Sequence, residues 1–173
     1  MIFKQAQLDN YLKKGDTSIK AFLLYGANEG LVSETSKKLA LTVCNNLNDP
    51  FCVVNLSWDE VKSDIGTLYS EYNAISLMGD RRVIILRDVD NELVKHLKEI
   101  IPSSKSDTLL ILCGGANLNN KSSLVTFASN SDFISAFACY EDREETLVNS
   151  TRTLLIEKGI TYTPDAFKLL CSR

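Results

Sequence analysis

The sequence predicts an α/β protein with a parallel sheet flanked by helices. Short apolar runs alternate along the chain with segments of helical periodicity. The runs are predominantly apolar and do not alternate apolar with polar residues, which is typical of strands buried on both faces. Each connection is long enough for a helical crossover, and such crossovers force parallel, right-handed pairing. We therefore expect a five-stranded parallel sheet between residues 20 and 140.

Each predicted element rests on a local pattern. The first helix, within residues 1–14, has Leu8, Tyr11 and Leu12 on one face. The five expected strands are residues 21–25, 51–56, 83–86, 108–113 and 133–140. The later helices are expected at residues 32–47, 57–75, 90–101 and 122–128, with breaks at Asn48-Asp49-Pro50 and at Pro102.

The helix expected at residues 57–75 leads to an unusual connection. Ser57 and Glu60 have the spacing of a capping box. One apolar face then follows at Val61, Ile65, Leu68, Tyr72 and Ile75. The loop after it, Ser76-Leu77-Met78-Gly79-Asp80, should lie on the surface, yet it carries two large apolar side chains. Leu77 and Met78 either fold back onto the core or form a plug for the pocket of a partner.

The pattern changes after Tyr140, so we place a domain boundary there. The acidic stretch 141–145 favours a helix N-terminus. Thr163 and Pro164 then form a strong helix start. That helix has only begun to show its apolar face at Arg173. We expect residues 141–173 to begin a helical domain that is incomplete here.

Composition excludes several classes of function. The chain has 173 residues, of which 45% are hydrophobic, and a formal net charge of −3. This charge argues against autonomous DNA binding, which needs a basic face. No apolar run is long enough to cross a membrane, and the start lacks the pattern of a signal peptide. The single histidine, His96, is expected on a solvated helix face and not in catalysis.

The cysteines are expected to be reduced. There are five, at positions 44, 52, 113, 139 and 171, and no two have the CxxC spacing of a zinc or redox site. Most lie in apolar runs, so we interpret them as small buried hydrophobic residues in a reducing cytoplasm. No metal site is expected.

A glycine-bearing loop follows the strand at residues 21–25 and suggests a phosphate-binding loop. The working motif is G-x-x-x-x-G-K-[ST]. Counted from Gly26, the second glycine is replaced by Leu31 and the lysine by Val32, and only the hydroxyl remains, as Ser33. Gly30 lies one position early. Val32 offers no charge to a triphosphate, so we predict a nucleotide-binding fold that does not hydrolyse nucleotide. In this interpretation the loop is an ordinary βα turn that uses its glycines for geometry.

The strand at residues 83–86 supports the same prediction. Read as the strand that supplies acids for magnesium, it ends in Arg87 before the first acid, Asp88, and the usual second acid is Val89. We therefore expect no catalytic residue and no cofactor.

With these residues in place, the chain resembles the delta subunit of bacterial DNA polymerase III, a clamp-loader subunit. The resemblance depends on the order and spacing of several motifs. They are Phe22-Leu23-Leu24-Tyr25-Gly26 with Glu29-Gly30-Leu31-Val32, Ser76-Leu77-Met78-Gly79-Asp80-Arg81-Arg82-Val83-Ile84, Thr108-Leu109-Leu110-Ile111 with Lys121-Ser122-Ser123, and the tail Tyr140-Glu141-Asp142 with Lys158-Gly159-Ile160-Thr161 and Pro164-Asp165-Ala166.

The resemblance implies an AAA+-type, P-loop-NTPase-like domain over residues 1–140 and the start of a helical lid over 141–173. It implies a non-catalytic subunit that binds and opens the sliding clamp through Ser76, Leu77 and Met78, where Met78 replaces the family's usual phenylalanine. It also implies a C-terminal collar domain, absent here, that joins the other loader subunits. DNA would be met only within that complex, in the cytoplasm and away from membranes.

Two other functions stay open at this point. An active AAA+ ATPase with an unusual phosphate loop would need a replacement for the lysine missing at Val32. A doubly wound, receiver-like domain would need acids clustered at the strand ends, and Asp88 and Asp90 are the only such pair.

Overall fold

The chain divides into two compact units, residues 1–140 and residues 141–173. The structure is a computed structural model. It describes residues 1–14, 17–74, 81–103, 106–140, 148, 151–152, 154–156 and 158–171.

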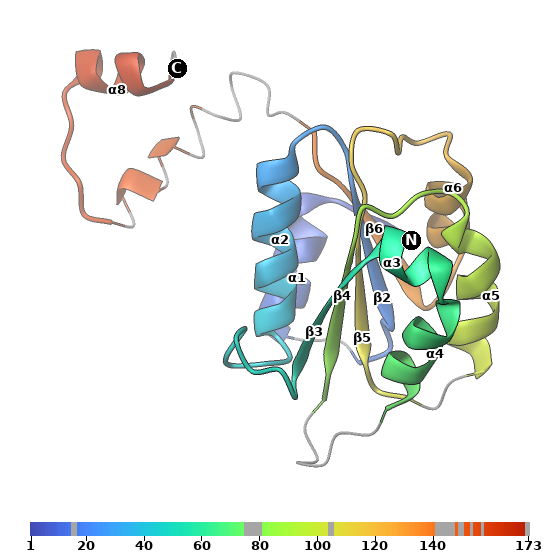
Figure 1. The fold of residues 1–173 in the computed structure, drawn as a ribbon. Coiled ribbons are helices and arrows are strands. Elements are labelled where there is room, and N and C mark those ends of the chain that lie inside the picture. The colour runs from blue at the N-terminus through green and yellow to red at the C-terminus, as the bar shows by residue number, and fades with distance from the viewer. Residues whose placement is uncertain are drawn as a thin grey trace. The chain divides into compact units, whose positions relative to one another are not determined.

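A six-stranded parallel sheet forms the centre of the first unit (Figure 1). Its strands, in spatial order, are β1 (Ile2–Phe3), β6 (Ile134–Ala138), β2 (Ala21–Tyr25), β5 (Leu109–Cys113), β4 (Val83–Arg87) and β3 (Val53–Ser57). Every neighbouring pair is parallel. The central strands β2 and β5 are buried at all five positions, as their unbroken apolar sequences predict.

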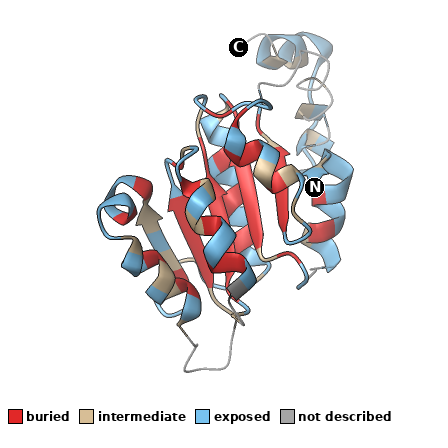
Figure 2. Cartoon of the chain, turned by 90° about the vertical axis from the view of Figure 1, so that its right-hand side faces the viewer, coloured by how far each residue is buried: buried red, intermediate tan, exposed pale blue. Residues whose placement is uncertain are grey.

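Helices cover both faces of this sheet. On one side lie α1 (Gln5–Lys14) and α2 (Glu29–Leu41), and on the other α3 (Trp58–Ser63), α4 (Ile65–Asn73), α5 (Leu93–Ser103) and α6 (Ser123–Ser129) (Figure 1). Figure 2 shows burial concentrated in the strands and exposure on the outer faces of the helices.

Side-chain alternation along the strands divides the core in two. In β2, Leu23 and Tyr25 pack with the cluster under α3 to α6, whereas Phe22 and Leu24 pack with the cluster under α1 and α2. Trp58 is 2% exposed and anchors the first cluster. The predicted parallel α/β architecture is therefore confirmed.

The predicted number of strands was wrong, because β1 adds a sixth. Ile2 pairs with Ala136 and Phe3 with Phe137 at the edge of the sheet. The N-terminal ammonium of Met1 also donates to the carbonyls of Ala128 and Ile134, each at 3.0 Å. Two residues are too few to show a strand periodicity, so only pairing with β6 defines this strand.

Three helix predictions also need correction. The segment expected as one helix breaks at Asp64, whose carboxylate accepts from the amide of Gly66 at 3.1 Å and starts α4. Ser57 precedes α3, but its side chain caps no amide, so the capping box is not formed. The helix expected to reach residue 47 ends at Leu41.

The cysteine prediction was wrong at two positions. Cys44 and Cys52 form a disulfide, with their Cα atoms 6.1 Å apart, in the connection between α2 and β3. Cys113 and Cys139 are free and buried, as expected, and Cys171 is free. The two cysteines are eight residues apart and have no CxxC spacing, so the sequence pattern did not reveal the pair. The turn between α2 and β3 brings their side chains together.

The second unit contains α8 (Pro164–Cys171), which begins at the predicted position. Thr163 Oγ1 accepts from the amide of Ala166 at 3.3 Å, as an N-cap does. Tyr162 stacks on Phe167, with ring centroids 4.9 Å apart. Across both units, none of the helices in the described ranges could cross a membrane.

Candidate functional site

A pocket of about 260 Å³ opens at the carboxyl ends of β4 and β5, beside the first turns of α2. Ligands of parallel α/β sheets bind at this edge. Nine residues line the pocket: Glu29, Val32, Ser33, Ser36, Arg87, Asp88, Cys113, Gly114 and Gly115. Of the predicted phosphate-loop residues, only Val32 and Ser33 line it.

Gly26 makes the turn from β2 into the loop. Its φ is +135°, a conformation that side chains rarely permit. A Cβ here would overlap the backbone carbonyl of Cys139. That carbonyl accepts from the amide of Asn28 at 3.1 Å, which fixes the loop against the end of β6. The glycine is therefore needed for loop geometry alone.

Two amides in the first turns of α2 are already paired with Asn28. Asn28 caps α2, and its Oδ1 accepts from the amide of Leu31 at 2.9 Å. The carbonyl of Asn28 accepts from the amide of Val32 at 3.0 Å. Free amides at a helix N-terminus are what make it an anion site. At this N-terminus Asn28 occupies the amides of Leu31 and Val32.

The charges around the pocket also disfavour a triphosphate. Glu29 places a carboxylate in the first turn of α2, and Asp88 adds a second. Arg87 is the one cation among the nine lining residues. Val32, at the position of the missing lysine, is only 8% exposed and packs in the core beneath α2. Like charges facing a polyanion raise the free energy of binding.

The strand that would supply magnesium ligands ends differently here. Arg87 is the last residue of β4 and pairs with Cys113. Asp88 follows in a left-handed conformation, with φ of 59°, and turns the chain away from the strand direction. Val89 is fully buried, and its amide donates to the carbonyl of Cys113 at 3.1 Å. Among the described residues, no group of three or more His, Cys, Asp or Glu could hold a metal ion.

The pocket floor offers no activated nucleophile. Burial raises the pKa of Cys113 to about 11, so its thiol stays protonated near neutral pH. Ser36 Oγ donates to the carbonyl of Ser33 at 2.8 Å. Ser36, Arg87 and Cys113 were not predicted as site residues. The sequence features that could have identified this pocket are the ends of the predicted strands and the Gly114-Gly115 pair after β5.

The predicted clamp-binding residues Ser76, Leu77 and Met78 lie outside the described residues. The chain on either side is well fixed at the opposite edge of the sheet from the pocket. Helix α4 ends at Asn73, and Arg82 Nη2 forms an ion pair with Glu71 Oε2 at 2.8 Å. Arg81 donates to the carbonyl of Asp107 at 2.5 Å.

The fold and this pocket define an AAA+-like domain whose phosphate loop lacks its lysine. The sequence matches the family described as DNA polymerase III, delta subunit, over residues 22–137. Because this match covers more than half of the chain, the protein belongs to that family.

Individual relatives agree with the family match. The chain is 26% identical over 165 residues to a protein of Rickettsia prowazekii (strain Madrid E) described as a probable DNA polymerase III subunit delta, covering 89% of this chain and 48% of the relative. The fold is similar to the DNA clamp loader delta protein of Bacillus subtilis, with a TM-score of 0.70 and 18% identity, covering 94% and 50% of the two chains.

A second solved structure shares the fold. It is a DNA polymerase III gamma subunit-related protein of Thermotoga maritima, with a TM-score of 0.52 and 16% identity, covering 84% of this chain and 49% of that one. The chain thus spans about half the length of the relatives it matches.

Proposed function

We propose that this protein is a clamp-loader subunit of bacterial DNA polymerase III that binds and opens the sliding clamp without hydrolysing ATP. Membership of the delta subunit family supports the clamp-loader role. One structural observation carries the non-catalytic role: the amides of Leu31 and Val32 are bonded to Asn28, and a buried valine replaces the lysine. Such a subunit acts through binding alone.

The proposed contact with the clamp is the stretch Ser76, Leu77 and Met78. It joins α4 to β4, and the ends of both elements are held by Arg81 and Arg82. Two large apolar side chains in a connection between two held elements are suited to enter a partner pocket. Met78 in place of phenylalanine still fills an apolar pocket.

We further propose the division of labour within the chain and its complex. Residues 1–140 form the AAA+-like domain, and residues 141–173 belong to a helical lid. Assembly with the other loader subunits would use a collar domain in the part of the relatives that this chain does not cover, and DNA would be met within that assembly. We place this subunit in the cytoplasm, where most thiols are reduced, so the Cys44–Cys52 disulfide would be an exception in that compartment.

A clamp-binding titration tests the proposal. The double change Leu77→Ala with Met78→Ala should weaken binding to the cognate sliding clamp by at least ~100-fold, because truncating hot-spot residues costs about 2 kcal/mol each. Its melting temperature should stay within about one degree of the wild type.

Leu170→Ala serves as the control. Leu170 is 54% exposed on α8, so its truncation removes an apolar surface side chain from the second unit and should leave clamp affinity unchanged. A double variant that loses its fold while clamp affinity per folded molecule is unchanged would mean that Leu77 and Met78 are core residues.

A further inference from the structure

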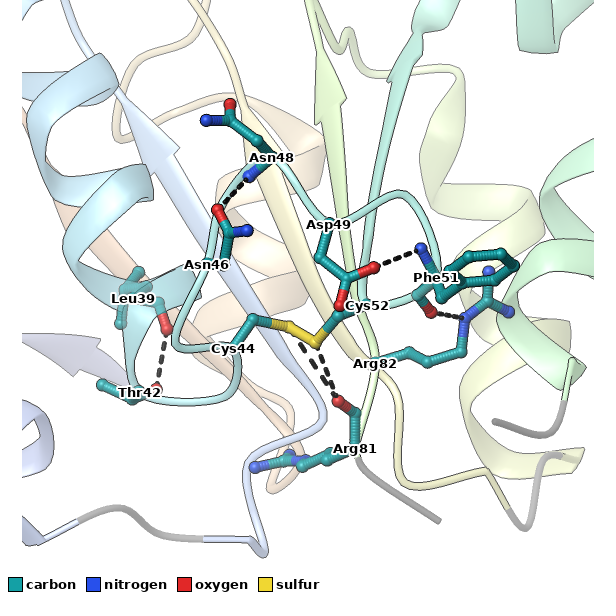
Figure 3. The surroundings of a disulfide bond; sticks show 10 residues. All are labelled: Leu39, Thr42, Cys44, Asn46, Asn48, Asp49, Phe51, Cys52, Arg81 and Arg82. Atoms are coloured by element: carbon teal, nitrogen blue, oxygen red, sulfur yellow. Dashed lines mark hydrogen bonds between the residues drawn. A yellow bond between two sulfur atoms is a disulfide. The ribbon is translucent and has the colours of Figure 1, made fainter. Parts of the chain in front are cut away.

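The connection between α2 and β3 is a closed, hydrogen-bonded loop. The Cys44–Cys52 disulfide joins its two ends (Figure 3). Asp49 fixes its last turn, since its Oδ1 accepts from the amide of Phe51 at 2.9 Å and its carbonyl accepts from the amide of Val53 at 2.8 Å. The loop thus has a defined conformation, set by one covalent bond and several hydrogen bonds.

This rigid loop presents a large apolar side chain to solvent. Phe51 is 72% exposed, more than any other large hydrophobic residue in the described part of the chain. Its amide is bonded to Asp49, and its carbonyl accepts from Arg82 Nε at 3.2 Å. Exposure of a phenylalanine carries no folding benefit. A backbone held from both sides fixes the point at which this side chain leaves the loop.

Arg82 links this loop to the proposed clamp-binding region. Its guanidinium bonds the carbonyl of Phe51 on one side and, on the other, both the carbonyl and the carboxylate of Glu71 in the last turns of α4. Arg82 follows Met78 by four residues. Figure 3 shows Arg82 beside Phe51 and Arg81 beside the disulfide. The disulfide-closed loop, the end of α4 and the chain just before β4 therefore meet at the amino-terminal ends of β3 and β4.

We propose that Phe51 is a second apolar anchor for the sliding clamp, presented by the disulfide-closed loop. This inference rests on the proposed function and extends its contact from one stretch to two. The clamp is the assigned occupant because Arg82 fastens Phe51 to the same chain segment that carries Leu77 and Met78. Aromatic residues are enriched among binding hot spots, and a backbone that is already held loses little conformational entropy on binding.

The test is a clamp titration of Phe51→Ala. The expected result is a loss of affinity of about tenfold, with a melting temperature within about one degree of the wild type, because an exposed side chain contributes little to folding. A melting temperature lowered by several degrees would overturn the proposal, since Phe51 would then be a structural residue.

Phe133→Ala is the matched control. Phe133 is also an exposed phenylalanine, 49% exposed, and lies just before β6. Strands β6 and β3 are four strand spacings apart in the sheet order, or roughly 19 Å at ~4.8 Å each. Its truncation should leave clamp affinity unchanged, and an equal loss for both variants would overturn the assignment of Phe51.

A third variant tests the role of the closed loop. In Cys44→Ser with Cys52→Ser the covalent closure is absent, so the ring should be less well positioned and clamp affinity should fall several-fold. Adding Phe51→Ala to that background should then cost less than it does in the wild type. Full additivity would contradict presentation by the disulfide-closed loop.

The outcomes separate this inference from the proposed function. If Leu77→Ala with Met78→Ala weakens clamp binding while Phe51→Ala remains within twofold of the wild type, the second anchor is wrong and the proposed function stands. If neither variant changes affinity, or the wild-type chain binds no clamp, both are wrong.

Discussion

At the scale of the residue, Gly26 shows how one backbone conformation fixes a loop. Its positive φ and the neighbouring carbonyl of Cys139 leave no room for a side chain. The loop after β2 therefore needs a glycine for steric reasons, independently of any contact with phosphate. A glycine retained by geometry is weak evidence for nucleotide binding.

Gly26→Ala should destabilise the protein by about 3 kcal/mol, since it adds backbone strain to a steric overlap with Cys139. The melting temperature should fall by roughly 10 °C. Gly30→Ala is the control, because Gly30 lies within α2 and a Cβ there would meet Asn28 Oδ1 at 3.4 Å. Alanine is the better helix former, so this variant should match or slightly exceed wild-type stability. Equal stability of both variants would contradict the role given to Gly26.

The buried thiols predict a loss of stability at alkaline pH. Burial raises the pKa of Cys113 to about 11 and that of Cys139 to about 12, from an ordinary value of 9.0. Below pH 9 both thiols are protonated in the folded and unfolded states, so the free energy of unfolding does not depend on them. Above pH 9 the unfolded chain releases these protons first, and stability should fall up to pH 11 by as much as about 1.4 kcal/mol per pH unit for each thiol.

Denaturant titrations between pH 8 and 10 measure this slope. The variant Cys113→Ala with Cys139→Ala lacks both groups, so its stability should change less between pH 9 and 10. An identical slope in variant and wild type would show that other groups cause the alkaline loss.

At the scale of the element, edge strand β3 depends on the connection that precedes it. β3 pairs only with β4, and its residues are less buried than those of β2 or β5. The Cys44–Cys52 disulfide ties its start to the turn after α2. A short covalent loop restricts the unfolded chain, which raises the free energy of unfolding.

The variant Cys44→Ser with Cys52→Ser should be less stable by about 2.5 kcal/mol, as expected for closing a loop of this length. Thermal unfolding without reductant measures the difference. Adding a dithiol reductant should lower the melting temperature of the wild type and leave that of the variant unchanged. A reductant effect of equal size on both proteins would assign the loss to something other than this bond.

At the scale of the whole molecule, the carboxyl ends and the amino-terminal ends of the strands have different roles in the proposed function. The pocket lies at the carboxyl ends of the strands, where Asn28 pairs with the amide of Leu31 and where Glu29 and Asp88 contribute carboxylates. Phe51, Arg81 and Arg82 lie at the amino-terminal ends of β3 and β4. We expect partner binding at the amino-terminal ends of the strands and no nucleotide chemistry at their carboxyl ends.

Calorimetry with ATP and magnesium should therefore give no binding heat at micromolar concentrations. The reason is the pairing of the α2 amides and the valine at the lysine position. A cooperative thermal transition of the same sample shows that the protein is folded. A micromolar dissociation constant would favour an active AAA+ ATPase.

The sequence by itself determined the parallel sheet, since five predominantly apolar runs separated by crossovers permit few other arrangements. It also showed that Val32 stands where the phosphate-loop motif has its lysine, because such a motif is compared position by position. Both features are local in sequence, and local patterns need no knowledge of the fold.

Tertiary structure alone decided the rest. The two residues of β1 form a strand only because β6 is there to pair with them. Cys44 and Cys52 bond because the turn between α2 and β3 brings their Cα atoms to 6.1 Å. The helix expected at residues 57–75 breaks at Asp64 although its apolar face continues through the break. The pairing of β1 with β6, the Cys44–Cys52 disulfide and the pocket all depend on how the chain folds in space. The order of residue types along the chain does not specify these distances.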